Sequence, residues 1–152
     1  MSQKQKTKIQ ELMFLLTDSS NIVRRVYNSH AKKLGINSID RRALVYINYC
    51  AGLTQVELAK FLDIEAQNLI LILDRLAKQD LIRKEQHPED RRAKCLFLTD
   101  KGKSLLDKLN RTLQSKVHPQ IIDGLEDEEF ETLYNAIIKI KSNLQNVDTA
   151  NI

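Results

Sequence analysis

Apolar residues recur at helical spacing through the first third of the chain. The spacing predicts a long helix that begins near Ile9 and ends near Gly35, where a glycine is a standard helix stop. A second amphipathic helix is predicted to follow a cap at Asn37 and Ser38 and to end at Gly52. The stripe of the first helix consists of Ile9, Leu12, Met13, Leu16, Val23 and Tyr27.

The stretch LTQVELAKFLDIEAQNLILILDRLAKQDLIRK, which begins at Leu53, predicts two short helices joined by a tight turn. Thr54 and Glu57 have the spacing of a capping box, in which the hydroxyl accepts the Glu57 amide and the carboxylate accepts the Thr54 amide. The first helix then starts at Gln55 and ends near Asp63, a residue type that tolerates left-handed backbone. The second runs from about residue 65 to 78. The two together form a helix-turn-helix pattern.

Two short runs that mix apolar and charged residues follow, LIRKE and RAKCLFL, separated by the turn-forming QHPEDR. They predict a β-hairpin attached to the helix-turn-helix, which makes a wing. Thr99 is expected to cap another long helix that is interrupted at His118 and Pro119. A last helix should start at the acidic EDEEFE, because negative charge suits a helix N-terminus, and it continues with apolar residues to Leu144.

The predicted fold class is therefore mainly α with a small β-hairpin wing. We expect an N-terminal dimerisation helix at residues 1–35, a winged helix-turn-helix at 36–102 and C-terminal dimerisation helices at 103–152 in one intertwined protomer. The terminal helices carry broad apolar stripes that the central module cannot cover by itself. A homodimer formed through those helices is the natural way to bury them.

Composition narrows the class of protein further. The 152 residues carry 24 Lys and Arg against 20 Asp and Glu, so the net charge of +4 permits a polyanionic partner without demanding one. We find no hydrophobic leader and no apolar run long enough to cross a bilayer, so we expect a cytoplasmic protein with no membrane partner. Cys50 and Cys95 are the two thiols, and a buried, inert role is expected for each.

Over nearly its whole length the sequence resembles the MarR/SlyA family of bacterial transcriptional regulators. The most specific match is DRRAKCLFLTDKG, in which Asp90, Arg92, Leu98, Thr99 and Gly102 have the family spacing D-x-R…L-T-x-x-G. The resemblance implies a homodimeric winged-helix protein whose recognition helices enter successive major grooves of pseudo-palindromic double-stranded DNA. Such proteins are usually repressors, and many release DNA when a small anionic or phenolic effector binds near the junction of the dimerisation and DNA-binding regions.

The candidate DNA-binding residues lie in the helix-turn-helix and in the wing. The recognition helix is the second helix of the helix-turn-helix, at residues 65 to 78. The face of this helix that packs on the domain carries apolar residues at the i, i+3, i+4, i+7 spacing, namely Leu69, Ile72, Leu73 and Leu76. Asp90 is expected to orient Arg92 for a narrow minor groove through a charge-assisted pair. The full set of candidates is Thr54, Gln55, Gln67, Asn68, Leu71, Arg75, Lys78, Arg91, Arg92 and Lys94.

The DNA-facing side of the recognition helix departs from the family at Ile70 and Leu71, where Ser or Thr and often Arg are common. Three interpretations stay open: the pair packs on thymine methyl groups, base specificity is weak and the wing and DNA shape dominate, or the face binds a protein partner. The last would make the chain a winged-helix protein-interaction module. Asp63 and Asp80 also replace family glycines, which should strain both turns by about 1 kcal/mol at most.

Position alone suggests Tyr27, His30, Arg41 and Tyr46 as effector-binding residues. The three histidines are far apart in sequence and no cluster has ligand spacing, so no metal and no cofactor are expected. Neither a nucleophile-base pattern nor a glycine-rich phosphate loop occurs in the sequence, and an enzyme is therefore not expected.

Overall fold

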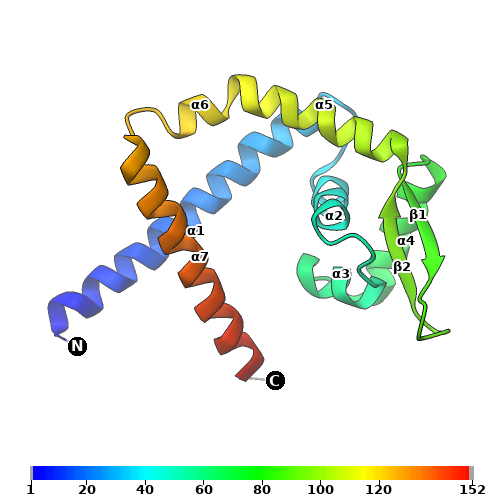
Figure 1. Ribbon diagram of the computed structural model, residues 1–152, viewed down its shortest axis with the longest axis horizontal. Coiled ribbons are helices and arrows are strands. Elements are labelled where there is room, and N and C mark those ends of the chain that lie inside the picture. The colour runs from blue at the N-terminus through cyan, green and yellow to red at the C-terminus, as the bar shows by residue number, and fades with distance from the viewer. Residues whose placement is uncertain (1, 151–152) are drawn as a thin grey trace. The chain divides into compact units, whose positions relative to one another are not determined.

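The computed structural model describes residues 2–150, with side chains up to residue 147. The chain forms two compact units that divide between Leu113 and Gln114, and each is described by itself. The elements, labelled in Figure 1, are α1 (Gln3–Lys32), α2 (Ser38–Tyr49), α3 (Gln55–Leu62), α4 (Ala66–Lys78), β1 (Ile82–Gln86), β2 (Lys94–Leu98), α5 (Asp100–Lys116), α6 (His118–Ile121) and α7 (Asp127–Ala150). This confirms the predicted mainly α fold with one hairpin.

The first helix begins earlier than the apolar stripe predicts, at Gln3. Its start is set by a capping box, in which the Ser2 amide donates to Gln5 Oε1 at 3.0 Å and the Gln5 amide donates to Ser2 Oγ at 3.3 Å. Two backbone amides that have no partner within the helix are satisfied in this way. The helix can therefore begin in a polar stretch, before the apolar stripe starts. At the other end α1 stops at Lys32, close to the predicted stop at Gly35, and Gly35 adopts a left-handed φ of 76°.

The helix-turn-helix is built as predicted. Asn37 caps α2 by accepting the Asp40 amide at 2.8 Å. The Thr54 capping box starts α3, and Asp63 ends it with φ 55° and ψ 55°. Asp80, after α4, also has a positive φ of 58°, so both aspartates hold the left-handed backbone that glycine adopts without strain.

The core of the first unit lies among α2, α3, α4, β2 and α5. Burial of the apolar face of α4 confirms that this side of the helix packs on the domain, and each fully buried leucine or isoleucine contributes about 1.5 to 3 kcal/mol relative to an exposed one. The same core fixes the position of the opposite face of α4. The buried residues of α4 are Leu69, Ile72, Leu73 and Leu76, and they join Leu44, Ile47, Leu58, Leu62, Leu96 and Leu109.

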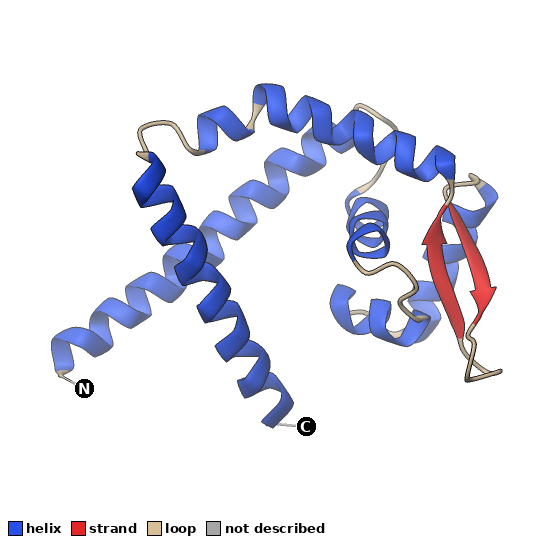
Figure 2. Cartoon of the chain, in the orientation of Figure 1, coloured by secondary structure: helices blue, strands red, loops and turns tan. Residues whose placement is uncertain are grey.

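The wing is a two-stranded antiparallel sheet that runs from the Ile82–Leu98 pair to the Gln86–Lys94 pair, drawn in red in Figure 2. Strand β2 is also joined to the segment before α3, because the Leu96 amide donates to the Leu53 carbonyl at 2.9 Å and the Gly52 amide donates to the Leu96 carbonyl at 3.1 Å. The base of the wing is therefore attached to the start of the helix-turn-helix.

Helix α5 packs so closely on the segment between α4 and β1 that only glycine fits at residue 102. A Cβ added at Gly102 would lie 2.1 Å from the Leu81 carbonyl oxygen. Thr99 holds this junction, since its hydroxyl donates to the Asp80 carbonyl at 2.6 Å and accepts the Gly102 amide at 3.0 Å. These contacts are the physical reason for the T-x-x-G part of the motif.

The two thiols differ in their surroundings. Cys95 is buried in β2, as predicted, but the prediction of a buried thiol is wrong for Cys50, which is exposed. Cys50 is the residue at which the chain leaves α2, with φ −122° and ψ 63°, so its side chain is no longer on the apolar face of that helix. None of the helices within residues 2–150 is long and apolar enough to cross a membrane.

The second unit contains α6 and α7. Helix α6 carries Pro119 in its first turn, where a missing amide costs nothing. Helix α7 has acidic residues in its first turn, and the Glu126 amide donates to Glu129 Oε2 at 3.1 Å. Many large apolar side chains of this unit are exposed: Ile121, Ile122, Leu125, Phe130, Leu133, Tyr134, Ile137, Ile138, Leu144 and Val147.

Candidate nucleic-acid interface

The tip of the wing presents an arginine whose backbone is held by the neighbouring aspartate. The Arg92 amide donates to Asp90 Oδ1 at 2.9 Å, and Arg92 Nε lies 3.5 Å from the same oxygen. The Arg92 side chain is 94% exposed. Arg91 and Lys94 are exposed beside it. Asp90 and Arg92 are in contact, but the shorter bond holds the Arg92 backbone rather than the side chain that the sequence led us to expect, and the guanidinium stays available to an outside anion.

Two side chains that the sequence reading did not single out shape the loop behind Arg92. Gln86 Nε2 donates to the Asp90 carbonyl at 3.2 Å and to the Ala93 carbonyl at 2.9 Å. His87 Nδ1 accepts the amide of Asp90 at 3.1 Å. These bonds satisfy loop groups that would otherwise face only solvent, and they make the wing tip a defined turn.

The exposed face of α4 is less polar than its sequence suggests. Gln67 Nε2 donates to Glu65 Oε2 at 2.6 Å, so the amide is engaged beside the start of the helix. Asn68 and Lys78 are exposed. Of the large apolar side chains of α4, Leu71 is the most exposed, at 68%, followed by Ile70 at 50%.

Arg75, expected to reach DNA, is bound to the protein itself. Its Nη2 donates to Asp40 Oδ1 at 2.5 Å and its Nε donates to Asp40 Oδ2 at 3.1 Å, across 35 residues of sequence. The Asp40 side chain is only 7% exposed, whereas that of Arg75 is 43% exposed. The hydrogen bond with Asp40 raises the pKa of Arg75 above its ordinary value. Arg75 thus braces α4 against the start of α2.

The acidic residue on the same face is also paired. Lys84 Nζ, from β1, donates to Asp74 Oδ1 at 2.8 Å, and this bond lowers the pKa of Asp74. The carboxylate stays ionised at neutral pH, and Lys84 offsets the charge that it would otherwise present to a polyanion. The pair also connects α4 to the wing.

Thr54 and Gln55 lie at the N-terminus of α3. Thr54 is occupied by the capping box, since its amide and hydroxyl both donate to Glu57 Oε2, at 2.7 and 2.8 Å. Those two bonds lower the pKa of Glu57. Gln55 is half-buried. The structure therefore gives Thr54 a role in forming the helix whether or not it also contacts DNA.

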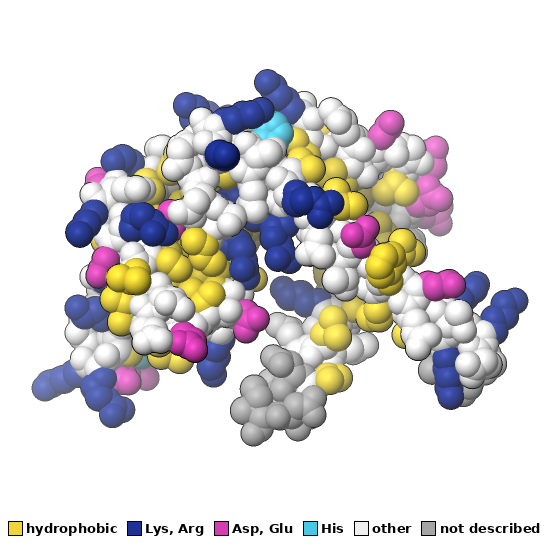
Figure 3. All heavy atoms as spheres, turned by 180° about the vertical axis from the view of Figure 1, so that it is seen from behind, with side chains coloured by type: hydrophobic (Ala, Val, Ile, Leu, Met, Phe, Trp, Pro, Cys, Tyr) yellow, Lys and Arg dark blue, Asp and Glu magenta, His cyan; other side chains and the backbone are white. Residues whose placement is uncertain are grey.

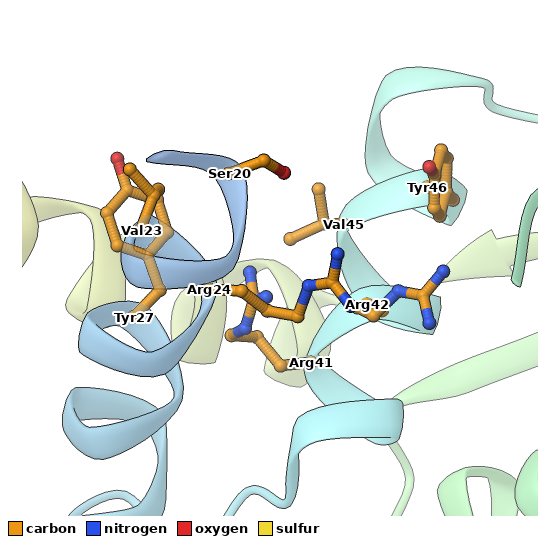
Figure 4. Close-up of a pocket in the computed structure, with 8 residues that line it drawn as sticks. All are labelled: Ser20, Val23, Arg24, Tyr27, Arg41, Arg42, Val45 and Tyr46. Atoms are coloured by element: carbon orange, nitrogen blue, oxygen red, sulfur yellow. The ribbon is translucent and has the colours of Figure 1, made fainter. Parts of the chain in front are cut away.

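A cavity of about 330 Å³ lies between α1 and α2, large enough for a small organic ligand. Three of the four predicted effector residues line it, namely Tyr27, Arg41 and Tyr46, while His30 is not among its lining residues. Figure 4 shows the side chains of α1 and α2 that surround this space. The remaining lining residues are Ser20, Val23, Arg24, Arg42 and Val45.

The cavity is cationic. Arg24, Arg41 and Arg42 contribute to it, and none of the described side chains that line it is acidic. The Arg41 guanidinium lies 5.8 Å from the centre of the Tyr27 ring, and Arg41 Nε donates to Asn28 Oδ1 at 2.9 Å. Burial and the neighbouring Arg42 lower the pKa of Arg41, and burial raises the pKa of Tyr27. An anion placed here would relieve repulsion between the arginines.

Tyr46 connects the cavity to the helix-turn-helix. Its ring stacks on that of Phe61 in α3, with the ring centres 5.1 Å apart and the planes inclined by 8°. Arg42 Nη2 donates to the Phe61 carbonyl at 3.3 Å. In residues 2–150 no group of three or more His, Cys, Asp or Glu side chains is placed to hold a metal ion.

Several residues of this region escape detection in the sequence. Asp40 is 35 positions from Arg75, and nothing in the local pattern pairs them. Arg24 and Arg42 join the cavity only once α1 and α2 pack together. Gln86 and His87, which hold the loop of the wing, gave a weak signal in the sequence, because they begin the turn sequence that separates the two strands.

Residues 40–94 match the family model described as MarR family. Wild-type MarR from E. coli, in its apo form, superposes with a TM-score of 0.72 at 25% sequence identity, covering 85% of this chain and 95% of that one. The transcriptional regulator PA3341 gives a TM-score of 0.76 at 28% identity, over 89% and 98% of the two chains. A variant of E. coli MarR solved with operator DNA gives 0.69 at 25% identity, over 88% and 95%.

Proposed function

Because this chain belongs to the MarR family, whose domain it carries at residues 40–94, we propose that it is a transcriptional regulator that binds double-stranded DNA as a homodimer. The observation that carries the proposal is the wing tip, where Asp90 holds the backbone of Arg92 and leaves its guanidinium 94% exposed. A narrow minor groove concentrates negative potential and attracts such a group. Exposed Lys78, Arg91 and Lys94 supply phosphate contacts.

Dimerisation is proposed from apolar surface that the single chain leaves in water. In α1 these side chains include Phe14 at 68% and Leu15 at 59% exposure, and α6 and α7 expose a further set. Surfaces of this kind on a small protein are contact sites. A two-fold dimer would place two recognition helices about one DNA turn apart, roughly 34 Å, and so fit a pseudo-palindromic site.

Repression and its release follow from the same proposal. A protein that occupies a site upstream of a gene blocks transcription until an effector lowers its affinity for DNA. The arginine-lined cavity between α1 and α2 suits a small anionic or phenolic effector. Since Tyr46 lines this cavity and stacks on Phe61 of α3, a ligand there is placed to shift the helix-turn-helix.

The proposal is tested by fluorescence anisotropy on a labelled duplex that carries the DNA upstream of the protein's own gene. The wild type should prefer this duplex over a shuffled one, and Arg92→Ala should weaken binding by about five-fold or more, as expected for a contact worth about 1 to 3 kcal/mol. Lys139→Ala is the matched control, since it removes an exposed positive charge from α7. If both variants lose the same factor in DNA affinity, Arg92 acts only through its contribution to the overall positive charge, which would contradict its assigned role.

A second candidate function is a protein-interaction module, favoured by the exposure of Ile70 and Leu71. Leu71→Arg separates the two. The substitution adds a cation to the exposed face of α4, so a protein that does not bind bases through this face should gain DNA affinity. A protein that reads bases through Leu71 should lose sequence preference instead.

A further inference from the structure

The recognition helix exposes aliphatic side chains where polar base readers are expected, and we propose that it reads methyl groups on pyrimidine C5 in the major groove. It would then accept thymine and 5-methylcytosine alike. This inference rests on the proposed DNA-binding function and names the chemistry that the site recognises. It is carried by the partners of the polar residues on α4.

Three polar side chains on the exposed face of α4 already have partners within the protein. Gln67 donates to Glu65, Arg75 donates to Asp40, and Asp74 accepts from Lys84. Each of these bonds occupies a donor or an acceptor and fixes the direction of the side chain, so turning the side chain towards a base would cost the existing bond. The bond from Arg75 to a carboxylate that is 7% exposed is the most expensive to break.

Besides Asn68 and Lys78, the remaining large exposed side chains of the helix are apolar. Leu71 and Ile70 are consecutive, with 68% and 50% of their surface in water. Val56, in the first turn of α3, is 64% exposed. Figure 3 shows apolar side chains on the helix-turn-helix and wing part of the chain, with both basic and acidic side chains around them. The exposed cations at the end of α4 and in the wing, Lys78, Arg91, Arg92 and Lys94, favour a polyanion over a protein as the occupant of this face.

Methyl recognition matches what an aliphatic side chain can distinguish. In the major groove thymine presents its C5 methyl group and a carbonyl, and cytosine presents an amino group. Leu71 and Ile70 have no polar atom with which to tell the carbonyl from the amino group, so their contact depends on the methyl group. Asn68, exposed and without a side-chain hydrogen bond among the described residues, can pair with a neighbouring adenine.

The energy of the contact sets the expected effect. Removing one methyl-sized group from water contributes about 0.8 kcal/mol, which is about a four-fold change in affinity for each methyl group contacted. Deoxyuridine differs from thymidine only in lacking this group, and it keeps every hydrogen-bonding edge. Replacing thymine by uracil in the bound duplex therefore isolates the interaction.

The test begins by selecting duplexes from a random pool with the full-length wild-type protein. Affinity is then measured for the selected duplex, for a copy with uracil at each thymine in turn, and for copies with cytosine or 5-methylcytosine at the sensitive positions. We expect uracil to weaken binding about four-fold at each contacted position. We also expect 5-methylcytosine to bind more tightly than cytosine by a similar factor.

Two variants assign the effect to the helix. Leu71→Ser should reduce the preference of thymine over uracil towards unity, whereas Arg92→Ala should weaken binding to both duplexes by the same factor. If the selected duplex binds equally well with thymine and uracil, methyl recognition is overturned while DNA binding stands. If no duplex is selected over random DNA, the proposed function itself fails, and a protein partner for this face becomes the better account.

Discussion

The bond between Asp40 and Arg75 should couple the recognition helix to α2, and a double-mutant cycle measures that coupling. Asp40→Asn keeps the shape of the side chain and the cap formed with Asn37, while Arg75→Met keeps an apolar stem of similar length. The double variant removes both partners together. Comparing the free energies of unfolding of all four proteins isolates the pairwise energy from the separate effects of each substitution.

The structure sets the size of the coupling. Ion pairs between exposed groups contribute about 0.2 to 1 kcal/mol, and hydrogen bonds to charged groups contribute about 1.5 to 3 kcal/mol. The Asp40 carboxylate is 7% exposed and Arg75 is 43% exposed, with bonds of 2.5 and 3.1 Å. A pair with one buried partner lies between these limits, so we expect about 1 to 2 kcal/mol. Arg75→Met should cost more than Asp40→Asn, because it leaves a buried carboxylate without its cation.

Urea unfolding at a fixed protein concentration gives the four free energies, since the stability of a dimer depends on concentration. DNA binding by the same proteins provides a second readout. If Arg75 acts by positioning α4, then Asp40→Asn and Arg75→Met should weaken DNA binding by similar factors, and the double variant should be no weaker than the worse single one. A coupling below about 0.3 kcal/mol, together with loss of DNA binding in Arg75→Met alone, would identify Arg75 as a direct reader and refute the bracing role.

Further predictions concern single positions. Gly102→Ala should destabilise the protein by about 2 kcal/mol or more in chemical unfolding, because its Cβ would lie 2.1 Å from the Leu81 carbonyl oxygen and α5 would have to move; an unchanged midpoint would contradict that packing. Asp80→Gly should instead stabilise it by up to about 1 kcal/mol, since φ is 58° there, and calorimetry should show a rise of about 2 to 4 °C; a fall would show that the left-handed residue is not strained. Glu57→Gln should lower the free energy of unfolding above pH 4.5, where the wild-type carboxylate is ionised in both the folded and the unfolded chain. Because the folded protein lowers the pKa of Glu57, this difference between wild type and variant should shrink as the pH falls through the folded pKa. A deficit that stays constant from pH 6 to pH 3 would mean that the carboxylate charge does not strengthen the cap.

Local signals in the sequence were sufficient for most of the fold. The capping box at Thr54, the stops at Gly35 and Asp63 and the apolar spacing in α4 each act within a few residues, so each could be read directly. The start of α1 was predicted late because its determinant is a polar pair, Ser2 and Gln5, rather than an apolar stripe. Cys50 was misplaced because one residue beyond a helix end, the periodicity no longer applies.

The candidate site was less predictable, because its chemistry depends on partners that are distant in sequence. Spacing placed Arg75 on the exposed face of α4 but could not show that Asp40 binds it there. In the same way, Tyr27, Arg41 and Tyr46 were suggested by position, yet the arginine cluster became visible only when α1 and α2 packed together. Wing residues Asp90 and Arg92 were easier to pair, since their contact is local.

The central claim, that this chain binds specific DNA through a cationic winged helix, is tested most directly by the salt dependence of binding. Affinity for the duplex upstream of the protein's own gene and for a shuffled duplex would be measured between 50 and 200 mM salt. If the dimer neutralises about 6 to 10 phosphates, affinity should fall by about 10³ to 10⁵ over this range, with the upstream duplex bound more tightly throughout. Equal affinity for the two duplexes at low salt, or binding that does not respond to salt, would contradict the account.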